Sequence, residues 1–148
     1  KQWLLPMANA LRSLGTEHAW LVHGSDGLDE ITITGPTHVV ELRGGQIREF
    51  EIAPEQFGLK RAKLADIKGG DPAANAEALR ALFDGALGPY RDIVLLNAAA
   101  ALVVADKVPD IAAGIKLAED ALDFARAREK LDALIRVTNR VDQRDIIE

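Results

Sequence analysis

Residues 23–30 read HGSDGLDE and separate two runs with strong β propensity, AWLV at residues 19–22 and ITIT at residues 31–34. Gly24 and Gly27 suit tight or left-handed backbone, in which a Cβ atom would be costly. The pattern predicts a strand that enters a glycine-broken loop and a second strand that leaves it. In open α/β sheets, ligands bind in loops at the ends of strands, so this loop is the first candidate for a functional site.

The adjacent carboxylates of Asp29 and Glu30 are the candidate chemistry of this loop. Carboxylate oxygens are hard ligands that suit Mg²⁺, an ion that usually keeps several waters and takes substrate phosphate at its remaining positions. Neighbouring acidic residues in a loop are more often simply solvated, and two carboxylates are a weakly specific metal motif. On residue types and spacing alone, both interpretations stay open.

Composition excludes several classes of protein. The chain has 148 residues, 48% of them hydrophobic, and a formal net charge of −5, which is typical of one or at most two globular domains. Because no basic cluster could hold phosphate backbones, nucleic acid is not expected as a partner. The longest apolar segment, residues 90–105, is too short to cross a bilayer, so no membrane partner is expected. The chain has no cysteine, which excludes disulfides and thiolate sites and suits a cytoplasmic protein.

The beginning of the chain predicts a layered fold. Residues 2–14 place apolar side chains at helical spacing before Gly15, which predicts an amphipathic helix with Trp3 in the core. Residues 18–23 are predicted to form a buried strand that contains Trp20. A helix, a tight turn and a strand in this order favour an α/β fold with a mixed, mostly parallel sheet.

Three further strands are expected near residues 31–34, 37–43 and 46–52. Residues 43–46 read RGGQ, a hairpin signal because diglycine supplies positive φ. The strands on either side show period-two features, as antiparallel strands with one solvated face do. We therefore expect the sheet to include an antiparallel hairpin and to be flanked by helices.

The second half of the chain is expected to be helical. Asp71 and Pro72 suit an N-cap and a first helical position. Asn97 interrupts the most apolar segment, and a buried amide must be hydrogen-bonded, so a structural bond to a neighbouring loop is favoured. We expect helices from Asp71 to about Gly85, within residues 90–105, from Pro109-Asp110, and over residues 124–138 with Phe124, Leu131, Leu134 and Ile135 buried, before a polar tail from Asn139.

Other catalytic motifs are absent from the sequence. His18, His23 and His38 have no metal-ligand spacing among them, and there is no Gly-x-Ser-x-Gly, Walker or Gly-x-Gly-x-x-Gly sequence. His23 adjoins the acidic loop and could be an acid or base, although a local structural hydrogen bond is favoured. The site within this chain is therefore two carboxylates and little else.

A set of short motifs follows in order along the chain: VHGSDGLDEIT at residues 22–32, GPT at 35–37, PEQFGL at 54–59, GGD at 69–71 with Asn75-Ala76, and LLNAAAAL at 95–102. Together these motifs resemble the anthranilate phosphoribosyltransferase family over about residues 3–105. The related thymidine and pyrimidine nucleoside phosphorylases share that family's fold but lack this acidic loop pattern.

The resemblance implies a reaction of tryptophan biosynthesis, in which phosphoribosyl pyrophosphate and anthranilate give phosphoribosyl-anthranilate and pyrophosphate. It implies that Asp29 and Glu30 bind Mg²⁺, and that the enzyme is a cytoplasmic homodimer. Residues 1–148 would be the C-terminal part of a nucleoside-phosphorylase/phosphoribosyltransferase-like α/β domain. The helical N-terminal domain, the glycine-rich pyrophosphate loop and most substrate contacts would precede this chain, which would be inactive alone. Asp123-Phe124 departs from the family's frequent Ser-Gly between the last helices.

Two other functions remain open on the sequence. One is a non-catalytic α/β module that binds a partner. The other is a nucleoside phosphorylase relative, which would bind phosphate and a nucleoside in place of anthranilate.

Overall fold

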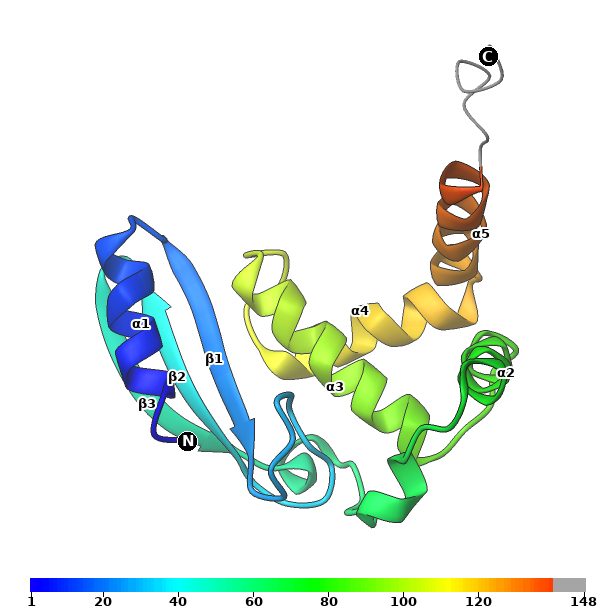
Figure 1. Ribbon diagram of the computed structural model, residues 1–148, viewed down its shortest axis with the longest axis horizontal. Helices are drawn as coiled ribbons and strands as arrows, with labels where there is room; N and C mark the ends of the chain where they lie inside the picture. The colour runs from blue at the N-terminus through cyan, green and yellow to red at the C-terminus, as the bar shows by residue number, and fades with distance from the viewer. Residues whose placement is uncertain (140–148) are drawn as a thin grey trace, which may run out of the picture.

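The computed structural model describes residues 1–139. A three-stranded sheet carries helix α1 on one face, and the remaining helices lie beyond its other face (Figure 1). Within residues 1–139, no helix is both long and apolar enough to span a membrane. The elements are α1 (Leu4–Ser13), β1 (His18–Gly24), β2 (Thr37–Arg43), β3 (Gln46–Ile52), α2 (Pro72–Phe83), α3 (Pro89–Val104), α4 (Ile111–Asp123) and α5 (Arg126–Thr138), with 3₁₀ turns η1 (Pro54–Phe57) and η2 (Leu64–Ile67).

The sheet has the order β1-β2-β3, and both strand pairs are antiparallel. The described residues contain no parallel pair, so the expected mostly parallel sheet is wrong for this part of the chain. The reason lies in the connections: a parallel pair requires a long crossover, usually a helix. Here β1 and β2 are joined by a loop without a helix, and β2 and β3 by a tight turn.

The expected hairpin is confirmed, with strands over residues 37–43 and 46–52. Gly44 and Gly45 have φ values of 56° and 79°, so both turn residues occupy the left-handed region that a two-residue hairpin requires. The turn chemistry thus sets the register of β2 against β3.

Residues 31–34 do not form the expected strand. The N–H of Ile31 donates to Oδ1 of Asn97 at 2.9 Å, and the N–H of Thr32 donates to Oγ1 of Thr37 at 3.0 Å. Because these backbone donors pair with side chains, the run is an irregular segment in spite of its β propensity.

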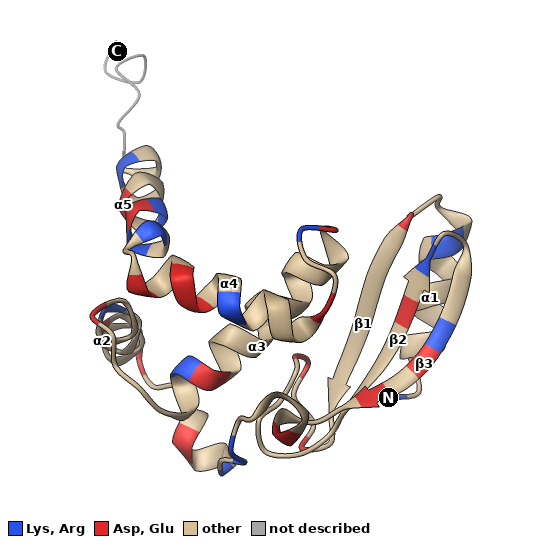
Figure 2. Ribbon diagram, turned by 180° about the vertical axis from the view of Figure 1, so that it is seen from behind, with Lys and Arg blue, Asp and Glu red and all other residues tan. Residues whose placement is uncertain are grey.

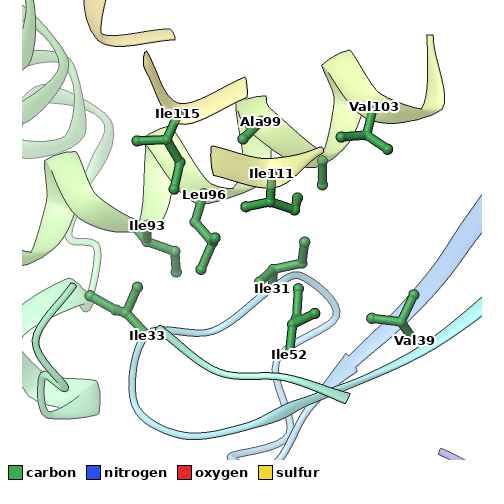
Figure 3. Packing of buried hydrophobic residues seen from close by; sticks show 11 residues of the cluster. Ile31, Ile33, Val39, Ile52, Ile93, Leu96, Ala99, Val103, Ile111 and Ile115 are labelled. Carbon is green, nitrogen blue, oxygen red and sulfur yellow. The ribbon is translucent and has the colours of Figure 1, made fainter. Parts of the chain in front are cut away.

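Strand β2 is buried on both faces. Val40 faces α1 and packs with Ala8, whereas Val39 belongs to the core between the sheet and α3. Figure 3 shows how loop residues Ile31 and Ile33 complete this core opposite α3. The buried members of the core are Ile31, Ile33, Val39, Ile52, Ile93, Leu96, Ala99, Ala100, Val103, Ile111 and Ile115.

Helices α3 and α4 approach closely. A Cβ atom at Gly114 of α4 would lie 2.8 Å from the Cα and Cβ atoms of Ala99 on α3. The small residues allow this contact, and the buried α3 thereby becomes a rigid support for the loop that precedes β2. The expected N-cap at Asp71 is confirmed, since its side chain accepts from the N–H of Ala74. The helix expected from Pro109-Asp110 begins at Ile111, and Asp110 caps it by accepting from the N–H of Ala113.

Two expectations of burial are wrong. The helix near the N-terminus exists, but Trp3 is 66% exposed because Ala8 is the residue that α1 turns to the sheet. On α5, Leu134 and Ile135 are exposed, and Phe124 before it is 71% exposed, because α5 projects away from α3 (Figure 1). The tail expected after Asn139 lies outside the described residues.

Candidate metal-binding loop

The loop between β1 and β2 is folded tightly at its beginning. The N–H of Gly24 donates to the carbonyl of Leu28 at 2.9 Å, and the N–H of Gly27 donates to that of Gly24 at 3.0 Å. Gly27 has a φ of 96°, as its sequence position suggested. Gly24 is needed for space, since a Cβ atom there would lie 2.5 Å from Oδ1 of Asp26.

Asp26 organises the loop. Its Oδ2 accepts 2.6 Å hydrogen bonds from the hydroxyls of Thr32 and Thr34, and its Oδ1 accepts from the N–H of Leu28 at 3.1 Å. Burial raises the pKa of Asp26, but these hydrogen bonds outweigh it and hold the pKa below its usual value. This role was not predicted from the sequence, although Asp26 precedes the threonines that bind it by six and eight residues.

The predicted ligands Asp29 and Glu30 both lie exposed on this loop. Glu30 borders a cavity of about 690 Å³ that is also lined by Lys68 and Tyr90. Partial burial raises the pKa of Glu30, and the negative charges of Asp29 and Asp26 raise it further. The loop therefore concentrates negative charge beside a cavity.

Asn97 ties this loop to α3. Besides accepting from the Ile31 N–H, its Nδ2 donates to the carbonyl of Ile31 at 2.8 Å and to that of Ile93 at 3.0 Å. The expected structural bond from Asn97 to a neighbouring loop is confirmed. It engages the residue directly after Glu30.

The donor set of the loop fits Mg²⁺ bound partly by water. Asp29 and Glu30 offer hard oxygen ligands. Burial is the larger cause of the raised pKa of Glu30, and a divalent cation would offset the smaller contribution from the charges of Asp29 and Asp26. Within residues 1–139, no three His, Cys, Asp or Glu side chains are grouped so that they could hold a metal. The pair would therefore leave positions for water and for phosphate oxygens, which is the usual arrangement for Mg²⁺.

The histidines lie apart from this chemistry. His23 stands opposite His38 in the β1–β2 register, and Nδ1 of His38 lies 2.6 Å from Oε1 of Glu51 on β3. His18 lies beside Glu41, at 3.5 Å. In the described part of the chain, no hydrogen bond or ion pair joins a histidine to Asp29 or Glu30.

Charge elsewhere on the molecule is mixed. Figure 2 shows Lys and Arg interspersed with Asp and Glu over the helices and the hairpin. Several are paired, such as Arg91 with Asp123 at 2.7 Å and Arg43 with Asp106 at 2.7 Å. The acidic loop is thus distinguished by its local geometry and not by the overall charge pattern.

Curated relatives confirm the resemblance noted in the sequence. The chain is 57% identical over 140 residues to an anthranilate phosphoribosyltransferase of Methylocella silvestris, covering 95% of this chain and 40% of the relative. It is 58% identical over 139 residues to that of Azospirillum brasilense, covering 94% of this chain and 39% of the relative. The chain thus spans about two fifths of the length of these relatives.

Solved structures agree with these similarities. Anthranilate phosphoribosyltransferase from Thermus thermophilus superposes with a TM-score of 0.73 at 42% identity, covering 82% of this chain and 35% of that one. The Saccharomyces cerevisiae enzyme in complex with PRPP and Mg gives a TM-score of 0.81 at 26% identity, covering 89% and 38%. A sequence profile described as the a/b domain of the glycosyl transferase family matches residues 1–128, and the chain therefore belongs to this family.

Proposed function

We propose that this chain is the C-terminal part of an anthranilate phosphoribosyltransferase. The complete enzyme would transfer the phosphoribosyl group from phosphoribosyl pyrophosphate to the amine of anthranilate, releasing pyrophosphate in tryptophan biosynthesis. The observation that carries the proposal is the 57% identity to a curated enzyme of that name over 95% of this chain.

We further propose that residues 1–148 are part of an α/β phosphoribosyltransferase domain. The chain matches 40% of its relative. The resemblance to the family implies that the complete protein would also have a helical N-terminal domain and the first part of the α/β domain. That protein would be a cytoplasmic homodimer, and most contacts to both substrates would lie outside this chain. The 148-residue chain alone is then expected to lack transferase activity.

Within the chain, Asp29 and Glu30 are the proposed magnesium ligands. Bound Mg²⁺ would neutralise charge on the departing pyrophosphate. The contribution of the chain is to hold two carboxylates on a loop that is braced by the hydrogen bonds of Asp26 and Asn97. Both carboxylates would then be available to the ion. The raised pKa of Glu30, caused by burial and by Asp29 and Asp26, supports this assignment because a cation would remove the repulsion.

The test uses the complete protein that carries this chain. Consumption of anthranilate, followed by its fluorescence, is measured with phosphoribosyl pyrophosphate and Mg²⁺. We expect the double variant Asp29→Asn, Glu30→Gln to lose about 100-fold or more in kcat/KM, in the range seen when charge stabilisation is removed from a reaction. Glu49→Gln, an exposed carboxylate on β3, is the control and should keep full activity.

Two outcomes would contradict the proposal. Phosphorolysis of a nucleoside without anthranilate transfer would indicate a nucleoside phosphorylase relative. A complete protein without either activity would favour a non-catalytic binding module.

A further inference from the structure

We propose that Asn97 is a positioning residue for the metal-binding pair, because its amide clamps the backbone of Ile31, the residue that follows Glu30. The inference rests on the proposed role of Asp29 and Glu30 as magnesium ligands. It adds a residue from α3, 67 positions after Glu30 in the sequence, that neither touches the ion nor carries a charge.

The clamp fixes both polar groups of one peptide residue. Oδ1 of Asn97 accepts from the N–H of Ile31 at 2.9 Å, while Nδ2 donates to the carbonyl of Ile31 at 2.8 Å. Only one orientation of the amide satisfies both bonds, since the N–H requires an acceptor and the carbonyl a donor. The second N–H of Nδ2 donates to the Ile93 carbonyl at 3.0 Å, so every donor of the side chain is used.

The base of the clamp is rigid. Leu96 and Ala99, which lie one residue before and two residues after Asn97 on α3, are fully buried, and Ala99 packs closely against Gly114 of α4. The side chain of Ile31 is itself 1% exposed and points into the core beside α3 (Figure 3). The backbone after Glu30 is therefore held from the core and not from the surface.

The other side of the acidic pair is held independently. Asp26 binds the hydroxyls of Thr32 and Thr34 and the N–H of Leu28, which draws the two arms of the loop together. Asp29 and Glu30 lie between the Asp26 hub and the Asn97 clamp. Their mutual repulsion would spread a free loop, so the clamp reduces the reorganisation that metal binding requires.

The experiment measures binding of Mn²⁺ alone, by electron paramagnetic resonance, to the complete protein that carries this chain. The test variants are Asn97→Ala and Asn97→Ser. A serine hydroxyl can still donate to the carbonyl four residues earlier, that of Ile93, but is too short to reach Ile31. Where Asn97→Ala loses cooperative unfolding, Asn97→Ser carries the test.

Asn75 supplies a matched control. Its amide accepts from the N–H of Gly70 at 2.8 Å and donates to the carbonyl of Gly70 at 3.1 Å, so it makes the same two-bond clamp before α2. Asn75→Ala should leave Mn²⁺ affinity unchanged. Both Asn97 variants are expected to weaken Mn²⁺ binding about 10- to 100-fold, as loss of groups that orient metal ligands does, and to speed amide hydrogen exchange at Ile31.

The outcomes separate this inference from the proposed function. If the native protein does not bind Mn²⁺, or if Asp29→Asn with Glu30→Gln leaves binding intact, the metal assignment fails. If the pair is required but both Asn97 variants bind Mn²⁺ as tightly as the native protein while Ile31 exchanges faster, the clamp is only structural and the inference is overturned.

Discussion

The indole Nε1 of Trp20 donates a 2.9 Å hydrogen bond to Oε1 of Glu41, a residue of the central strand that is only 7% exposed. Oε2 of the same carboxylate accepts from Nε and Nη2 of Arg48 on β3, at 3.1 and 2.9 Å. Trp20, Glu41 and Arg48 stand opposite one another in the register of the three strands. A charge is thus held inside the sheet because donors from both neighbouring strands satisfy it.

This arrangement predicts energetic coupling between Trp20 and Glu41. Trp20→Phe keeps an aromatic ring near Phe50 but removes the donor to Oε1, so we expect a loss of about 1–3 kcal/mol in the free energy of unfolding. Urea unfolding of Trp20→Phe, Glu41→Leu and the double variant measures the coupling, because leucine offers no acceptor to the indole. Strictly additive losses would show that the hydrogen bond contributes nothing beyond packing.

Acid sensitivity should arise from Glu41 and Asp26. Burial raises the pKa of Glu41, but hydrogen bonds from Trp20 and Arg48 outweigh it, and the pKa lies below the ordinary 4.5. The pKa of Asp26 likewise lies below 3.8, because bonds from Thr32, Thr34 and Leu28 outweigh burial. A carboxyl whose pKa is lower in the folded state stabilises the fold above its ordinary pKa. That stabilisation is lost as the pH falls through the folded-state value.

Urea unfolding between about pH 7 and about pH 3 tests this for Asp26. Asp26→Asn should be less stable than the native chain at neutral pH, and the difference should shrink as the pH falls. The exposed carboxylate of Asp132 on α5 provides the control, since Asp132→Asn should change neither the stability nor its pH dependence. Parallel curves for the native chain and Asp26→Asn would contradict the role of Asp26 as the charged hub of the loop.

Local chemistry made much of this fold predictable. The Gly44-Gly45 turn set both strands of the hairpin, and Asp71 and Asp110 marked the starts of two helices through bonds within four residues. Asn97 could be assigned a structural bond because a buried amide requires partners. The turn and the two helix starts depend on groups close in sequence, and the Asn97 prediction depends only on the need of one buried amide for hydrogen-bond partners.

Non-local partners explain what the sequence did not predict. The run at residues 31–34 has strand propensity, but the side chains of Asn97 and Thr37 take its backbone donors. The spacing of apolar side chains on α5 is typical of a helix with one buried face. Burial also requires another element opposite that face, and α5 projects away from α3. The position of Asp29 and Glu30 on the loop was predictable, whereas the Asp26 hub that shapes the loop was not.

Removal of a candidate ligand should stabilise the metal-free chain. Burial and the charges of Asp29 and Asp26 raise the pKa of Glu30, so at neutral pH its carboxylate is less favourable in the folded than in the unfolded chain. Glu30→Gln is therefore expected to raise the Tm measured by circular dichroism in the presence of EDTA. Glu77→Gln, on the exposed face of α2, is the control and should leave the Tm nearly unchanged.

The same variant should lose stabilisation by metal. An ion that binds only the folded chain raises Tm with its concentration, so Mg²⁺ should raise the Tm of the native chain more than that of Glu30→Gln. Equal Tm values for the two chains in EDTA would show that neither burial nor repulsion makes the Glu30 carboxylate unfavourable in the folded chain. A lower stability of the metal-free chain with Glu30 than with glutamine is expected if Glu30 serves ligand binding, because functional residues often cost stability.

Ala125 links α4 to α5 with a φ of 59°. This left-handed conformation is unfavourable for residues other than glycine, because it brings the Cβ atom too close to the following carbonyl oxygen. The chain is held there from both sides: Asp123 at the end of α4 accepts a 2.7 Å hydrogen bond from Arg91, and Arg128 on α5 pairs with Asp84. Ala125→Gly should therefore relieve strain, and we expect a gain of about 0.5–1 kcal/mol after the greater freedom of glycine in the unfolded chain is subtracted.

Ala121→Gly, inside α4, is the matched control and should lose about 1 kcal/mol, because glycine disfavours a helix interior. Urea unfolding of the two variants beside the native chain gives the comparison. Equal losses at positions 121 and 125 would mean that Ala125 continues a helix in solution. A gain at Ala125 alone would show that the chain changes direction between α4 and α5 through a left-handed residue in solution, against the backbone preference of alanine at the junction.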